Sequence, residues 1–354
     1  MLLKSKMEFP SMTKELCHYK TGEKRSFTMR AFVPGDEAGM IACIRDEYAD
    51  SYFKRDFYDP DKLRDKALGG HYVFFVAQTD EEIAGMEIFA LFTELGDDYI
   101  EPASQIFKTA YRGYGLAAAL VEYTFALAKQ MQPAALFVHA VTFHSITQKV
   151  CGAQGMIPTG FRLGSFLAER MHNSYPIGNC PKHSEGIMIL PVQKTDAGRV
   201  YVPKELKEYV SGCYDRLGMG YTLCFDREEL PGRSAELSVV TDELQRTVLI
   251  RVLQSGGDLI HQVQQIMEPH DSDSLYTYQI ALPADSGVAI TEYEQLKELG
   301  FFFTGLKAAC GRSEQFYMQW CGSLELHMEE YVLTEDFARL RDEILHFYNT
   351  RKMV

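Results

Sequence analysis

One segment near the middle of the chain constrains the fold more than any other: an apolar strand runs directly into a glycine-bearing turn and then into an amphipathic helix. Residues 100–108 are typical of a strand, and residues 112–115 read Arg-Gly-Tyr-Gly. The residues that follow place Leu116, Leu120 and Leu127 on one helical face. Strands joined to helices in this way build sheets with helices on their faces. We therefore expect a mixed α/β fold.

The rest of the first half contains the other elements that such a sheet needs. The Thr-Asp-Glu-Glu turn at residues 79–82 separates two apolar runs and predicts an antiparallel hairpin. The expected strands span residues 26–32, 72–78, 83–92, 135–141, 157–164 and 186–192, and the expected helices span residues 36–47, 60–68 and 145–154.

The second half repeats this order of elements. Residues 155–162, GMIPTGFR, align without gaps on residues 300–307, GFFFTGLK, with Gly160 matching Gly305. A chain of 354 residues also exceeds what most single cores hold. We therefore expect two related lobes. The predicted division is a polar leader at residues 1–25, a first lobe at 26–198 and a second lobe at 199–354 that ends in a helix.

Composition narrows the class of partner. The formal net charge of -13 disfavours nucleic acid and anionic membranes, since both need clustered cations, and it favours a cationic small molecule. None of the eight cysteines stands in a Cys-x-x-Cys pair or at zinc-like spacing with histidine, so we expect reduced thiols and no metal. No apolar run is long enough for a membrane span or a signal peptide, which predicts a cytoplasmic protein.

The turn at residues 112–117 has the chemistry of an anion site. Glycines allow close backbone approach, successive N–H groups converge, and the helix N-terminus adds partial positive charge. Arg112 can add a charge-assisted contact. A plain tight turn is the alternative for two glycines before a helix.

The run AYRGYGLAAALV resembles the acetyl-CoA signature of the GNAT acetyltransferase family, and AQGMIPTGF resembles its closing helix-to-strand segment. The resemblance covers about half of the chain. It implies a GNAT-like fold and acetyl transfer from acetyl-CoA to the amine of a small molecule or peptide. The cofactor contacts that it implies are Ile106, Phe107, Lys108, Arg112, Gly113, Tyr114, Gly115, Leu116, Ala117, His144 and Gln148.

The resemblance also indicates candidate catalytic residues. Cys151 stands where many members carry a tyrosine acid, and inert packing is its alternative role. His144 either contacts the cofactor, forms structural hydrogen bonds or transfers a proton. Glu101 and Glu87 are candidate bases for the acceptor amine, and a solvated carboxylate is the alternative for each.

The acceptor wall is expected in the aromatic segment at residues 49–58. Its candidate substrate-binding residues are Tyr52, Phe57 and Tyr58, joined by Glu87, and an aromatic core plug is the alternative.

The second lobe reads LQSGGDLIHQ at the corresponding junction, with Asp258 where a diphosphate disfavours negative charge. A degenerate lobe is expected, with a weak anion site as the alternative; completing the acceptor pocket or forming a homo-oligomer contact is the further role that the lobe can take. For the whole protein, the alternatives to an acyltransferase are an acyl-CoA-binding sensor without turnover and an interaction scaffold.

Overall fold

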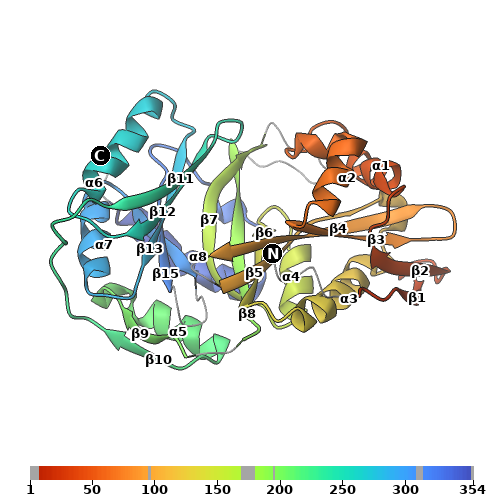
Figure 1. Cartoon of the computed structure of the whole chain (residues 1–354), viewed down its shortest axis with the longest axis horizontal. Coiled ribbons are helices and arrows are strands. Elements are labelled where there is room, and N and C mark those ends of the chain that lie inside the picture. The colour runs from red at the N-terminus through yellow and green to blue at the C-terminus, as the bar shows by residue number, and fades with distance from the viewer. Residues whose placement is uncertain (1–7, 95–96, 169–179, 194–195, 308–313, 352–354) are drawn as a thin grey trace. The chain divides into compact units, whose positions relative to one another are not determined.

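The computed structural model describes residues 8–94, 97–168, 180–193, 196–307 and 314–351. They group into two compact units, each built from helices and strands (Figure 1). The first unit comprises the described residues up to Val138 together with Lys149–Gly155. The second comprises His139–Gln148, Met156–Ala168 and the described residues from Cys180 onward. The prediction of a mixed α/β fold is confirmed.

The first unit carries the elements around the glycine-bearing turn. Its strands are β1 (Met12–Cys17), β2 (Lys24–Ala31), β3 (Tyr72–Gln78), β4 (Ile83–Glu94), β5 (Asp97–Phe107) and the start of β6 (Ala135–Val141). Its helices are α1 (Glu37–Tyr48), α2 (Pro60–Leu68), α3 (Leu116–Gln130) and the end of α4 (Ile146–Ala153). Strands β3 and β6 match their predicted ranges to the residue.

The sheet of this unit has a core on each face. Strands β1 to β5 are each antiparallel to the next, and β6 runs parallel to β5. Because side chains alternate along a strand, Phe74, Met86 and Ile88 pack on one face with the residues of α1 and α2. Phe75 points to the other face, where its ring contacts Tyr123 of α3.

Strand β1 corrects the expectation of a polar leader at residues 1–25. It pairs antiparallel with β2, with Met12 opposite Met29 and Cys17 opposite Lys24. Only Met12 and Leu16 of this strand are even partly buried. An edge strand with so few inward-facing apolar residues lacks the alternating pattern by which a sequence reveals a strand.

The second unit contains the remaining elements. Its further strands are β7 (Ile157–Leu167), β8 (Lys182–Pro191), β9 (Gly198–Tyr201), β10 (Tyr221–Cys224), β11 (Glu236–Asp242), β12 (Thr247–Gln254), β13 (Thr277–Pro283), β14 (Phe302–Lys307) and β15 (Gln315–Trp320). Its further helices are α5 (Lys207–Leu217), α6 (Leu259–Met267), α7 (Val288–Glu298) and α8 (Glu335–Asn349). The main strands follow the order β8-β7-β14-β15-β13-β12-β11.

The chain repeats one order of elements. Strand β5 leads through α3 to its parallel neighbour β6, and α4 then leads to the antiparallel pair β7 and β8. Strand β12 leads through α6 to its parallel neighbour β13, and α7 leads to the antiparallel pair β14 and β15. This repetition is what the alignment of residues 155–162 with 300–307 predicts.

The two aligned segments also meet. Strands β7 and β14 pair antiparallel with Gly160 opposite Gly305, which are matching positions of the alignment. A Cβ on Gly160 would lie 2.6 Å from the Cα of Gly305, so the close approach requires glycine. Each of these strands therefore has a partner along an edge that would otherwise be unpaired.

The compact units do not follow the predicted division at residue 198, because β7 and β8 group with the second unit. The predicted division concerns related lobes and stays a prediction. Among the helices described, none combines the length and the apolarity that a membrane span needs.

Candidate functional site

The glycine-bearing turn presents backbone amides at the start of α3. Gly113 has φ +91° and Gly115, which precedes the helix, has φ +74°, a region that favours glycine. No side chain caps the helix, and no group in the described part of the chain accepts a hydrogen bond from the amides of residues 113–117. These amides, together with the helix dipole, are donors of the kind that can hold an anion.

Residues between β1 and β2 contact the glycine-bearing turn on the side of its carbonyl groups. The Tyr19 amide, in the turn between β1 and β2, donates to the Gly113 carbonyl at 3.0 Å. A Cβ on Gly113 would lie 2.5 Å from Nε2 of His18, whereas one on Gly115 would meet nothing within 4 Å. The hairpin that was expected to be a leader therefore fixes the turn, and the space beside Gly115 stays open.

Strands β5 and β6 separate beside this turn. In the described part of both strands, the register pairs only Tyr99 with Ala135 and Ile100 with Leu136, although β5 continues to Phe107. Parallel strands that part in this way leave backbone groups of β5 without a sheet neighbour on that side.

A β-bulge shapes β5 within the separated stretch. Ser104 and Gln105 oppose the single residue Glu87, because Ala103 pairs with Ile88 and Ile106 pairs with Met86. Ser104 has φ +53°, which is uncommon for a residue other than glycine.

Beyond the bulge, the amide of Phe107 is directed toward the separation. The Lys108 amide donates to the Ala84 carbonyl at 2.9 Å, on the β4 side. Alternate residues of an antiparallel strand direct their N–H groups to opposite sides, so that of Phe107 points away from β4. This is the type of donor that can polarise a carbonyl.

The cations around the turn are already paired. The Arg112 guanidinium contacts Glu47 of α1, and the Lys108 ammonium contacts Glu82. The Thr109 amide donates to Asp46 at 2.6 Å. If Arg112 contacts an anion, as predicted, its guanidinium must share its donors between that anion and the Glu47 carboxylate. The backbone amides of the turn are therefore the main donors for the negative charge of an anion.

Glu87 is a fully buried carboxyl that is hydrogen-bonded to Gln105, one of the two bulge residues. Its Oε1 accepts from the Gln105 amide at 2.6 Å, and its Oε2 accepts from the Thr124 hydroxyl of α3 at 2.7 Å. Burial raises the pKa of Glu87 to about 7, against the opposing effect of the two hydrogen bonds. Sequence reasoning missed Gln105 and Thr124 because no local pattern marks a bulge or the helix packed against it.

The two candidate bases lie on opposite faces of the sheet. Glu101 pairs with Ala90 and shares the face of Ile88, which is the face of α1 and α2. Glu87 points to the face of α3. The structure therefore places Glu101, half-buried, on the side of the aromatic segment and separates Glu87 from it.

The aromatic segment is largely core. Tyr52 and Phe57 are buried in the cluster under α1 and α2, with Tyr58 packed against it. The Tyr52 hydroxyl nevertheless reaches the bulge, where it donates to the Ser104 hydroxyl at 2.8 Å. The Lys54 ammonium reaches the same oxygen at 3.1 Å. The segment thus combines the core role with a polar contact at the bulge.

Cys151 is fully buried, and burial followed by the negative charge of Glu87 raises the pKa of its thiol. This environment supports the packing role. Among the described residues, no group of three or more potential ligands could hold a metal ion.

His144 and Gln148 belong to the second unit. The His144 ring accepts from the Ile146 amide at 3.3 Å, at the start of α4. The Gln148 amide nitrogen donates to the Val332 carbonyl at 3.1 Å, and its oxygen accepts from the Thr334 amide at 2.9 Å. These contacts support a structural role for Gln148 that ties α4 to residues 332–334.

The corresponding turn of the second unit is occupied by the chain itself. The Asp258 carboxylate, before α6, accepts from the Ser234 hydroxyl at 2.6 Å and the Ala235 amide at 2.7 Å. These hydrogen bonds lower the pKa of Asp258 to about 2. The Gly257 amide donates to the Arg233 carbonyl at 3.0 Å, and a Cβ on Gly256 would lie 2.1 Å from the Ala235 nitrogen. The turn therefore offers neither the space nor the amides that a diphosphate needs.

Comparisons with known proteins give only distant likenesses. No protein-family model matches the sequence, and no curated protein sequence matches it significantly. Among solved structures, the ribosomal-protein-S18-alanine N-acetyltransferase of Escherichia coli is 13% identical with a TM-score of 0.37, over 47% of this chain and 94% of that one. The ribosomal-protein-S5-alanine acetyltransferase of Vibrio fischeri is 13% identical with a TM-score of 0.39, over 51% and 97%. The spermidine/spermine N-acetyltransferase of Vibrio cholerae is 15% identical with a TM-score of 0.37, over 47% and 92%. At such scores these likenesses carry no argument about chemistry, which rests on the chain's own residues.

The raised pKa of Glu87 predicts a pH-dependent stability. Between the ordinary value of 4.5 and about 7, the folded protein holds a proton that the unfolded chain releases. Protonated Glu87 therefore contributes about 3 kcal/mol to the free energy of unfolding. This contribution is fully present below pH 4.5 and is lost as the pH rises through 7. A Glu87→Gln variant should lack this component when urea unfolding is measured at pH 5 and pH 8. Glu15→Gln, at an exposed position, serves as control, and an unchanged pH slope in Glu87→Gln would contradict the assignment.

Proposed function

We propose that the first half of the chain binds acetyl-CoA at the glycine-bearing turn and transfers the acetyl group to an amine. The observation that carries this proposal is the row of amides at residues 113–117, which donate to no group among the described residues and follow the stretch of β5 that parts from β6. A pyrophosphate suits the amides and the helix N-terminus, and an extended acyl-pantetheine arm suits the separated strands. The resemblance of AYRGYGLAAALV to the GNAT signature agrees with this placement.

The chain's own residues support a direct transfer. Acetyl-CoA supplies an activated thioester, and the Phe107 amide is the donor that can stabilise the oxyanion formed when an amine attacks it. The attacking amine must first lose a proton, because a free alkyl ammonium has a pKa near 10.4. Glu101, on the face of the aromatic segment, is the candidate base. Tyr52 and Lys54, which meet at Ser104, would border the acceptor.

A sensor that binds acyl-CoA without turnover is the second candidate. The observation that favours it is the full burial of Cys151, the residue at the position where the family commonly carries an acid. A buried thiol with a raised pKa is a poor proton donor to the leaving thiolate. Acetyl transfer then requires water or another group to protonate the thiolate.

Binding of coenzyme A tests the site. Thermal unfolding of the full chain should shift upward with CoA concentration, and calorimetric titration should give one site per chain, since Asp258 and residues 233–235 fill the second turn. Gly115→Leu should abolish both signals by filling the open space beside the amides. Gly198→Leu is the matched control, because Gly198 also has positive φ, +66°, and also meets nothing within 4 Å. Two sites that survive Gly115→Leu would place the cofactor elsewhere.

The pairing of Arg112 with Glu47 predicts a gain of affinity. Glu47→Gln removes a negative charge beside the turn and frees the guanidinium, so CoA should bind about three- to tenfold more tightly. Glu122→Gln, which removes an exposed carboxylate paired with Lys14, should leave the affinity unchanged in the same titration. Weaker binding by Glu47→Gln would show that Arg112 does not face the ligand.

Turnover separates the enzyme from the sensor. Release of free thiol from acetyl-CoA should depend on added primary amine, and Cys151→Ala should keep kcat within about threefold, because the buried thiol is packing rather than acid. A loss of two or more orders of magnitude with CoA binding intact would instead make Cys151 the acid. Binding of CoA without release in the presence of any amine would favour the sensor.

A further inference from the structure

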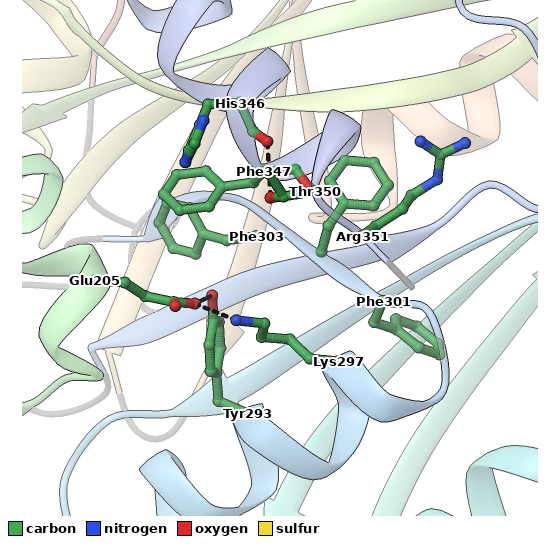
Figure 2. Close-up of a pocket in the computed structure, with 10 residues that line it drawn as sticks. Glu205, Tyr293, Lys297, Phe301, Phe303, His346, Phe347, Thr350 and Arg351 are labelled. Atoms are coloured by element: carbon green, nitrogen blue, oxygen red, sulfur yellow. Dashed lines mark hydrogen bonds and ion pairs between the residues drawn. The ribbon is translucent and has the colours of Figure 1, made fainter. Parts of the chain in front are cut away.

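A solvent-open cavity of about 130 Å³ lies in the second unit, apart from the features that the proposed function uses, and the Glu205 and Lys297 side chains in its lining are 43% and 41% exposed. Helices α7 and α8, the start of β14 and the segment around Glu205 border it (Figure 2). Its walls are aromatic: Phe301, Phe302 and Phe303 from one strand end, and Phe347 from α8. Phe301 and Phe303 are fully buried, so their rings are held in place by the core.

Glu205, Tyr293 and Lys297 form one polar group of the lining, and His346, Thr350 and Arg351 of the α8 side are further polar residues that border the cavity. Oε1 of Glu205 accepts from the Tyr293 hydroxyl at 2.7 Å and from the Lys297 ammonium at 2.6 Å. Oε2 of Glu205 accepts no hydrogen bond from any residue that the structure describes. Burial alone would raise the pKa of Glu205, but the bonds from Lys297 and Tyr293 bring it below its usual value. The carboxylate therefore stays ionised, with one oxygen available.

The charges of this polar group are matched. In Figure 2, Glu205 and Lys297 point toward each other, and the Arg351 guanidinium points away from them. Arg351 instead stacks on the Tyr348 ring at 3.6 Å. A cationic ligand bonded to Glu205 would face the Lys297 ammonium, and an anionic ligand would face the carboxylate. Electrostatics therefore favour a neutral ligand with a hydrogen-bond donor.

We propose that this cavity binds a small neutral aromatic molecule carrying one hydrogen-bond donor, of the class of phenol. The ring would pack against Phe303 and Phe347, and the donor would bond Oε2 of Glu205. The volume suits one ring, since an apolar cavity of about 150 Å³ accepts benzene. Aromatic walls favour the ring by edge-to-face contacts. This site is independent of the acyl-CoA site, so either can be disproved alone.

Calorimetric titration and saturation-transfer NMR of the full chain test the ligand class. The probes are phenol, anisole as the same ring without a donor, benzylamine as a cation and benzoate as an anion. Phenol should bind about tenfold more tightly than anisole, because only phenol can donate to the free carboxylate oxygen. Absence of phenol binding, equal affinity for phenol and anisole, or tighter binding of either ion would overturn the proposal.

Variants test the location. Thr350→Trp places a large side chain at an exposed lining position and should abolish phenol binding. Thr222→Trp, at an exposed threonine of the same unit that does not line the cavity, should leave it unchanged. Glu205→Gln should reduce the preference for phenol over anisole at least threefold while keeping the binding of the ring. Circular dichroism checks that each variant folds. If Thr350→Trp does not fold, Glu205→Gln decides, and an unchanged preference in that variant would overturn the proposal.

Discussion

The separation of β5 from β6 after two residue pairs is the constraint on which the candidate site depends. It releases one side of β5 from the sheet while β4 still holds the other side, so the Phe107 amide keeps its direction and meets no strand partner among the described residues on that side. The bulge at Ser104 and Gln105 bends β5 within this stretch. Glu87 then fixes the bulge to α3 through Gln105 and Thr124. A buried polar network of this kind is stable only when its members are satisfied, which explains why a carboxyl can lie there.

Ion pairs beside the turn decide which groups of the candidate site could hold an anion. The cations beside the turn bond carboxylates of the same unit, so an anion would be held mainly by backbone amides and the helix dipole. In the second unit the equivalent amides are covered by residues 233–235, and Asp258 adds a negative charge at the helix start. The same order of strand, turn and helix therefore occurs twice in the described residues, and the two turns differ in the space and the amides that they leave open.

Sequence reasoning located the elements better than the contacts between them. The strands at residues 72–78 and 135–141 were predicted to the residue, because apolar periodicity and turn residues are local signals. The repeat was visible because Gly160 and Gly305 must both be glycine where β7 meets β14. Strand β1 was missed, since an exposed edge strand buries too little to show a pattern. The opposite faces of Glu87 and Glu101 follow from the register of β4 and β5, in which Glu101 lies opposite Ala90, three residues along β4 from Glu87.

The sequence by itself therefore determined the α/β class, the repeated order of elements and the position of the glycine-bearing turn. These follow from side-chain periodicity and from the backbone conformations open to glycine, which act over a few residues. Only the tertiary structure decided that Arg112 bonds Glu47, that Glu87 is buried with a raised pKa, and that residues 233–235 fill the second turn. Each of these joins groups distant in the sequence, and their energies depend on burial and on neighbouring charge, which a linear pattern does not record.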